Sequence, residues 1–115
     1  MQHDMRPSAF SQLRRGVIEF CVLALLVERE RYGFELVRTL GSAEGLDVAE
    51  GTVYPLLSRL RADGLVTTRW NESRTGPPRR YYAISTRGRE ALRSFEGEWR
   101  RFSAAVDGLL GRGST

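Results

Sequence analysis

The 115-residue sequence predicts one mainly helical domain of the α+β class, with the element order helix–helix–helix–strand–strand–helix. Three observations support this order. Apolar residues recur at helical spacing in three segments of the first half of the chain. Two stretches rich in β-branched and aromatic residues follow, separated by glycine and proline. The last segment carries a heptad repeat of apolar residues, which is typical of a long helix that packs against another helix.

The first two helices are expected at residues 11–29 and 32–40, after a loose N-terminal arm at 1–10 that shows no periodicity. The first helix is apolar nearly all round from Val17 to Val27, which indicates burial on several sides. The second helix has an apolar stripe that is expected to face the core: Phe34, Leu36, Val37 and Leu40. A further short strand in the connection between these two helices is compatible with the sequence.

The third helix is expected at residues 50–63, with Pro55 in its first turn. Its core-facing stripe consists of Val53, Leu56, Leu57 and Leu60. Its other side combines hydroxyl groups with arginine: Thr52, Tyr54, Ser58, Arg59 and Arg61. Two strands at 65–70 and 80–84 are then expected to form a hairpin, with 71–78 as the connecting loop.

Positive charge is concentrated on this third helix and the hairpin. The chain has 18 basic residues, all arginine, and 14 acidic residues, which gives a net charge of +4. Residues 52–80 contain six arginines and two acids, also +4, so the rest of the chain sums to zero. A surface of this kind is expected to meet a polyanion. Arginine suits that task because its planar fork matches phosphate oxygens and guanine edges.

Together these elements predict a winged helix-turn-helix domain over residues 11–85 that binds double-stranded DNA. The polar side of the third helix would enter the major groove, and Tyr32 would reach a phosphate from the start of the second helix. Arg74, at the hairpin tip, would enter a minor groove. Three hairpin arginines are expected on one face, against phosphates: Arg69, Arg79 and Arg80. The alternatives are an ordinary amphipathic surface helix and a solvated basic hairpin.

The final helix is expected at residues 86–110, followed by a frayed tail at 111–115. Its apolar seam consists of Leu92, Phe95, Trp99, Phe102, Val106 and Leu109. This seam predicts a dimerisation helix and a homodimer, to which the first helix contributes. The alternative is that the seam packs on the first helix of the same chain. Trp99 is expected either as a plain interface residue or as the wall of a pocket for a small aromatic or apolar effector.

Enzymatic, metal-binding and membrane functions find no support in the sequence. His3, the single histidine, lies in the N-terminal arm, and Cys21 is the single cysteine, expected as a core thiol. No catalytic grouping, metal-ligand set, cofactor motif or phosphate-binding glycine loop is present. No segment reads as a signal peptide or membrane span, so a cytoplasmic protein without a cofactor is expected.

Several motifs resemble those of the PadR family of transcriptional regulators. They are Tyr32-Gly33-Phe34-Glu35-Leu36; Glu50-Gly51-Thr52-Val53-Tyr54-Pro55-Leu56-Leu57 with Arg59-Leu60 and Gly64-Leu65-Val66; and Gly76-Pro77-Pro78-Arg79-Arg80-Tyr81-Tyr82 with Thr86 and Gly88. The likeness covers about residues 13–110 and is closest to the short subgroup with a single C-terminal helix. One departure concerns Ala49, where the family often has serine or threonine. The third helix must then be capped by Asp47, by Thr52 or by backbone groups.

The resemblance implies a winged-helix fold, a homodimer formed by the first and last helices, and repression that a small molecule relieves. A palindromic operator is expected for such a dimer. In multidrug-sensing members a tryptophan of the last helix lines the effector site, and Trp99 matches it. The alternative from another class is a winged-helix module that binds a protein or an effector and has no DNA target.

Overall fold

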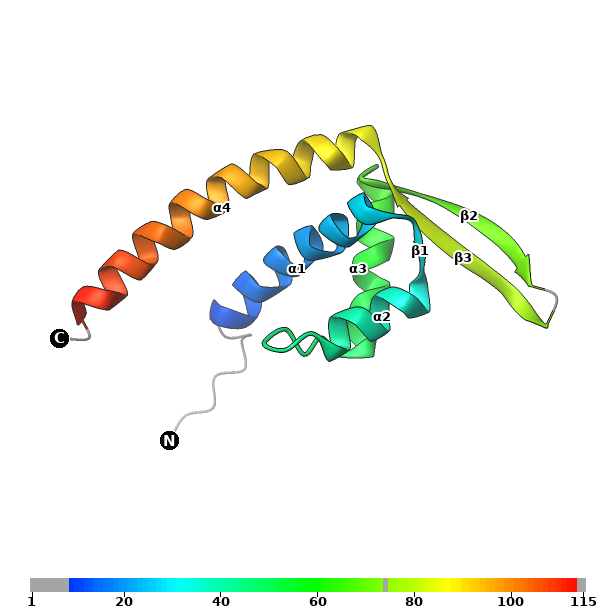
Figure 1. The fold of residues 1–115 in the computed structure, drawn as a ribbon, viewed down its shortest axis with the longest axis horizontal. Coiled ribbons are helices and arrows are strands. Elements are labelled where there is room, and N and C mark those ends of the chain that lie inside the picture. Colours follow the sequence, from blue (N-terminus) through cyan, green and yellow to red (C-terminus); the bar gives the residue numbers. More distant parts are fainter. Residues whose placement is uncertain (1–8, 74, 114–115) are drawn as a thin grey trace.

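The computed structural model describes residues 9–73 and 75–113. Three helices cluster around one core, a long hairpin projects to one side, and the last helix arches alongside the first (Figure 1). The elements are α1 (Ala9–Glu28), β1 (Arg31–Tyr32), α2 (Gly33–Ser42), α3 (Glu50–Ala62), β2 (Val66–Ser73), β3 (Gly76–Ile84) and α4 (Thr86–Gly113). The predicted mainly helical α+β fold and its element order are confirmed, and β1 is the short strand between the first two helices.

The core forms where α1, α2, α3 and the base of the hairpin meet. It contains Ile18, Val22, Leu23, Leu26, Leu36, Val37, Leu40, Val48, Val53, Leu56, Leu57, Leu60, Val66, Tyr82 and Leu92. The predicted stripe of α3 is confirmed in full. The stripe of α2 is confirmed except for Phe34, which is 48% exposed. Phe34 is the second residue of α2 and lies beside the hairpin, outside the shared core.

The sheet is antiparallel with the order β1-β3-β2, so β3 is its central strand. β2 and β3 pair as far as Ser73 and Gly76, so the expectation of a loop over 71–78 is wrong. The loop was predicted because prolines 77 and 78 are unusual within a strand. One proline faces the edge of β3 that is open beyond its pairing with β1, and the other faces β2 where the register shifts between Asn71 and Ser73, so neither removes a regular ladder bond.

Other predicted boundaries also shift. α1 begins at Ala9, so the expected arm at 1–10 is too long, and residues 1–8 lie outside the described part of the chain. α4 continues to Gly113, so most of the expected tail at 111–115 is helical, with 114–115 outside the description. Pro55 is the sixth residue of α3 and lies beyond its first turn.

A close junction joins the hairpin to α4. The Ser85 hydroxyl accepts the Gly88 N–H at 2.9 Å, which caps α4, and donates to the Gly64 carbonyl at 2.7 Å. The Ser85 N–H donates to the Leu65 carbonyl at 3.1 Å. These bonds hold α4 at a defined angle to the base of β2.

Candidate nucleic-acid interface

The start of α3 has no side-chain cap. Ala49 is the N-cap residue, in an extended conformation, and its carbonyl accepts the Thr52 N–H at 2.9 Å. Asp47 instead adopts a left-handed conformation with φ of 44°. Of the three caps considered from the sequence, the backbone is therefore the one used. Residues 50–52, which begin α3, are exposed, and the N–H groups of the first two suit an external acceptor.

The polar side of α3 faces solvent, as predicted, but its two flanks differ. Helical spacing puts Tyr54 and Arg61 on one flank and Arg59 on the other. Tyr54 packs against the start of α2, where a Cβ on Gly33 would lie 3.0 Å from its ring. Arg59 turns toward α1, with its Nε 3.1 Å from a carboxylate oxygen of Glu19. The structure therefore does not bring Arg59 to the centre of the exposed face.

The hairpin arginines lie on two faces, so the expectation of one shared face is wrong. Arg69 and Arg79 share the outer face with Tyr81 and Tyr32, with guanidinium-to-ring distances of 4.8 Å for Arg69–Tyr81 and 4.6 Å for Arg79–Tyr32. Arg80 lies on the opposite face, 5.0 Å from the ring of Trp70, with which it pairs across the strands. Alternating strand residues point to opposite faces, which separates Arg79 from Arg80.

Arg69 is engaged within the protein. Its guanidinium donates two hydrogen bonds to Glu30, one of them at 3.2 Å from Nε. The Arg69 hydrogen bond lowers the pKa of Glu30, and Glu30 raises the pKa of Arg69. Glu30 immediately precedes β1, so this pair fixes the outer face of the wing to the connection between α1 and α2.

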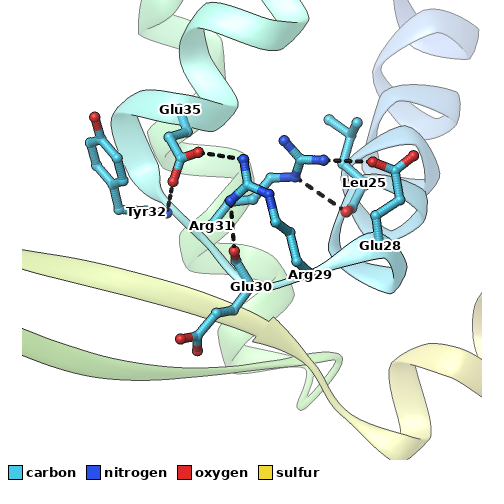
Figure 2. A network of polar contacts seen from close by, with 7 residues as sticks. All are labelled: Leu25, Glu28, Arg29, Glu30, Arg31, Tyr32 and Glu35. Atoms are coloured by element: carbon cyan, nitrogen blue, oxygen red, sulfur yellow. Dashed lines mark hydrogen bonds and ion pairs between the residues drawn. The ribbon is translucent and has the colours of Figure 1, made fainter.

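A polar network extends from this connection into α1 and α2 (Figure 2). The buried Arg31 donates to the Leu25 carbonyl at 3.3 Å and to Glu28 at 2.6 Å. Arg29 donates to Glu35 at 2.8 Å and so lowers the pKa of that carboxyl, which also accepts the Tyr32 N–H at 3.2 Å. The network satisfies the start of α2 and positions Tyr32 beside the wing.

Three predicted wing or helix arginines carry no ion pair within the described residues: Arg61, Arg79 and Arg80. Arg74 lies outside the description, and its predicted role at the hairpin tip stays a prediction. Trp70 was not among the predicted site residues, and Phe34 was predicted in the core. Both lie beside Arg79 and Arg80. Alternation within each strand does not show that Trp70 faces Arg80, because the pairing depends on the register between β2 and β3.

The seam of α4 meets α1 along only part of its length. Leu92 is buried, Phe95 stacks on Phe20 with ring centroids 4.0 Å apart, and Trp99 stacks on Phe95 at 5.8 Å. Farther along, Phe102 and Leu109 are 54% and 64% exposed. A cavity of about 440 Å³ lies between α1 and α4. Its lining includes Leu13, Glu19, Phe20, Phe95, Trp99 and Phe102.

Within residues 9–73 and 75–113, no helix combines the length and the apolar character that a bilayer span requires. That same part of the chain brings no three potential metal-ligating side chains together. Cys21 is half-buried rather than fully buried, and burial raises the pKa of its thiol.

Comparison with known proteins agrees with this geometry. The profile of the "Transcriptional regulator PadR-like family" matches residues 22–94. Transcriptional regulator Rv3488 of Mycobacterium tuberculosis is 36% identical over 83 residues, which cover 70% of this chain and 74% of that protein. A Streptococcus transcriptional regulator of known structure is 40% identical, with a TM-score of 0.76 and coverage of 85% and 96% of the two chains.

A PadR-like regulator from Bacillus cereus gives a similar result, with 37% identity, a TM-score of 0.75, and coverage of 86% of this chain and 96% of that one. All three relatives carry the name of a transcriptional regulator. The family profile spans α2, α3 and the whole hairpin, which are the elements that bear the exposed arginines. The chain therefore belongs to the PadR-like family of transcriptional regulators and has the DNA-binding winged-helix fold of that family.

Proposed function

We propose that this regulator is a homodimer that represses transcription by binding a palindromic operator, and that a small aromatic or apolar molecule releases it. The exposed side of α3 reads the major groove while the hairpin holds the flanking strand. Two copies related by a two-fold axis read two half-sites, which accounts for the palindrome. We place this action in the cytoplasm, with the DNA.

The observation that carries DNA binding is the set of arginines that no carboxylate neutralises within the described residues. Arg61 extends from α3, and Arg79 and Arg80 extend from β3. Each phosphate that such a group neutralises releases about 0.9 of a counterion, so affinity must fall steeply as salt rises. Arg69 contributes less, because Glu30 already holds its guanidinium.

The salt dependence of binding tests this account. Fluorescence anisotropy with duplex DNA from the protein's own promoter region measures affinity at several salt concentrations. Replacing Arg79 and Arg80 with alanine should lower the slope of log affinity against log salt by about two. The matched control replaces Arg100 and Arg101, which lie on the outer side of α4, and should leave the slope unchanged. Affinity that does not respond to salt would exclude phosphate contacts.

Unburied apolar residues support the homodimer. Phe10 and Leu13 on α1 and Phe102, Leu109 and Leu110 on α4 are 45% to 70% exposed. A monomer rarely leaves so much apolar area in water, whereas a second copy can bury it. Val106→Asp should dissociate the dimer in sedimentation and abolish operator binding. Ala104→Asp adds the same charge on the opposite side of α4 and should do neither.

The cavity between α1 and α4 supports the effector. Its stacked rings suit a flat apolar molecule, and Trp99 provides a fluorescent reporter inside it. A panel of flat aromatic compounds should include one that quenches Trp99 and releases the operator duplex at the same concentration. Quenching without release would remove the regulatory role from this cavity.

A further inference from the structure

The hairpin and the starts of α2 and α3 enclose a second hollow, which we call the aromatic groove. It has a volume of about 480 Å³, and its lining includes residues of both hairpin strands. Six of its lining residues carry the argument: Tyr32, Phe34, Tyr54, Trp70, Arg79 and Arg80. The groove therefore joins the two elements that carry the exposed arginines.

Three aromatic side chains of the groove are exposed to solvent. Phe34, Tyr54 and Trp70 are 48%, 43% and 63% exposed, although each is large enough to stabilise a core. The other large exposed apolar residues of the described chain lie on α1 and α4, where the proposed dimer seam accounts for most of them. Neither the core nor that seam covers Phe34, Tyr54 or Trp70.

The groove is also electropositive. Its lining contains two arginines and no carboxylate among the described residues. The guanidinium groups lie over aromatic rings, with Arg80 at 5.0 Å from Trp70 and Arg38, just outside the groove, at 6.0 Å from Phe34. The Nε of Arg80 is buried and has no hydrogen-bond partner within the described residues. An occupant must therefore combine negative charge with an apolar surface.

We propose that the aromatic groove binds one sugar–phosphate segment of the DNA strand that runs from α3 to the wing. The deoxyribose lies against Trp70 and Phe34, and its phosphate faces Arg80, which lies on the same face of the hairpin as Trp70. This inference rests on the proposed DNA-binding function and extends it to two residues, Phe34 and Trp70, that carry no charge. Charge complementarity favours this occupant over an uncharged molecule, and the position of the groove between α3 and β3 favours a strand that contacts both.

Single-tryptophan proteins give a direct test, because the chain has only Trp70 and Trp99. Trp99→Phe leaves Trp70 as the sole reporter, and Trp70→Phe leaves Trp99. Iodide quenching is measured at constant ionic strength with and without saturating promoter duplex. DNA should reduce the quenching of Trp70 several-fold and leave that of Trp99 nearly unchanged. Equal quenching of Trp70 in the free and bound protein would overturn the proposal.

The affinity test separates apolar contact from charge. Trp70→Ala and Phe34→Ala should each weaken duplex binding about five- to tenfold with an unchanged salt slope, because no phosphate contact is lost. Arg80→Ala should weaken binding and also lower the slope by about one. Thr67→Ala, on the other face of β2, is the control and should bind like the unaltered protein. Unchanged thermal melting of these surface variants confirms that they fold.

Two negative results are distinguishable. If the unaltered protein binds its duplex but Trp70→Ala and Phe34→Ala bind equally well, the groove proposal fails and the proposed function stands. If the unaltered protein binds no duplex at all, both fail. Protection of Trp70 by an aromatic effector but not by DNA would also overturn the proposal, since the groove would then bind a small molecule.

Discussion

Replacing Gly88 with alanine should destabilise the protein strongly, because this residue lies at the junction between the hairpin and α4. A Cβ there would lie 2.8 Å from Ile84 Cγ1 and 3.1 Å from the carbonyl carbon of Leu65, and closer still to the Leu65 oxygen. The backbone of Leu65 cannot swing aside as a flexible side chain would. The helix α4 must therefore move away from the base of β2.

The size of the effect follows from three contributions. Overpacking of this kind costs about 1–3 kcal/mol. Moving α4 also weakens the 3.1 Å hydrogen bond from Ser85 to Leu65, which is worth about 1 kcal/mol. Alanine recovers up to about 1 kcal/mol of helix propensity. The net loss is about 1–3 kcal/mol, which corresponds to a fall in melting temperature of roughly 4–12 °C for a chain of this size.

Thermal denaturation followed by circular dichroism measures this change, at one fixed protein concentration so that the melting temperatures can be compared directly. Gly97→Ala is the matched control in the same helix. A Cβ there meets only the end of Arg101, at 3.8 Å, so this variant should melt at or slightly above the temperature of the unaltered protein. If Gly88→Ala melts like Gly97→Ala, the close approach of α4 to Leu65 does not contribute to stability.

Three further predictions concern the ion pairs. Arg31→Met removes the donor to the Leu25 carbonyl and should lower the free energy of unfolding by about 1–2 kcal/mol in urea denaturation. An unchanged urea midpoint would contradict this. Glu35 has a lowered pKa, so its ionised carboxylate stabilises the fold above the unfolded pKa of about 4.3, and this stabilisation is lost as the pH falls through the folded pKa. Glu35→Gln should therefore reduce the dependence of the melting temperature on pH in the acid range. An unaltered dependence would contradict this. Arg59→Ala should leave operator preference in selected DNA pools unchanged, because Glu19 already holds the guanidinium, and a changed consensus would show that Arg59 reads bases.

Much of the fold could be predicted because burial leaves a periodic record in the sequence. Leu56, Leu57 and Leu60 recur with helical spacing and are all buried in α3. Phe34 fits the same pattern in α2 but is exposed, because periodicity reports which side of a helix a residue is on and not how far the core extends. Phe34 lies beyond that limit and lines the aromatic groove instead.

The faces of the wing could not be predicted because they depend on strand register. Tyr81 and Tyr82 lie on opposite faces, with Tyr82 buried and Tyr81 partly exposed. The same alternation applied to Arg79 and Arg80 separates them as well. The cross-strand register decides which of these two arginines lies opposite Trp70, and in the structure it is Arg80. The register follows from the length of the turn, and the two prolines made that turn seem longer than it is.

The number of arginines available to bind DNA is smaller than the net charge of residues 52–80 suggests. Residues 52–80 carry a net +4, but Glu19 and Glu30, both outside that range, hold Arg59 and Arg69. Glu30 and Arg69 are 39 positions apart, so no local pattern could indicate their pairing. The pairing therefore moves the proposed binding surface toward Arg79 and Arg80, and hence toward the aromatic groove. Some arginines join elements of the fold, and those without a carboxylate partner among the described residues are the ones proposed to meet the polyanion, a division that depends on the tertiary structure.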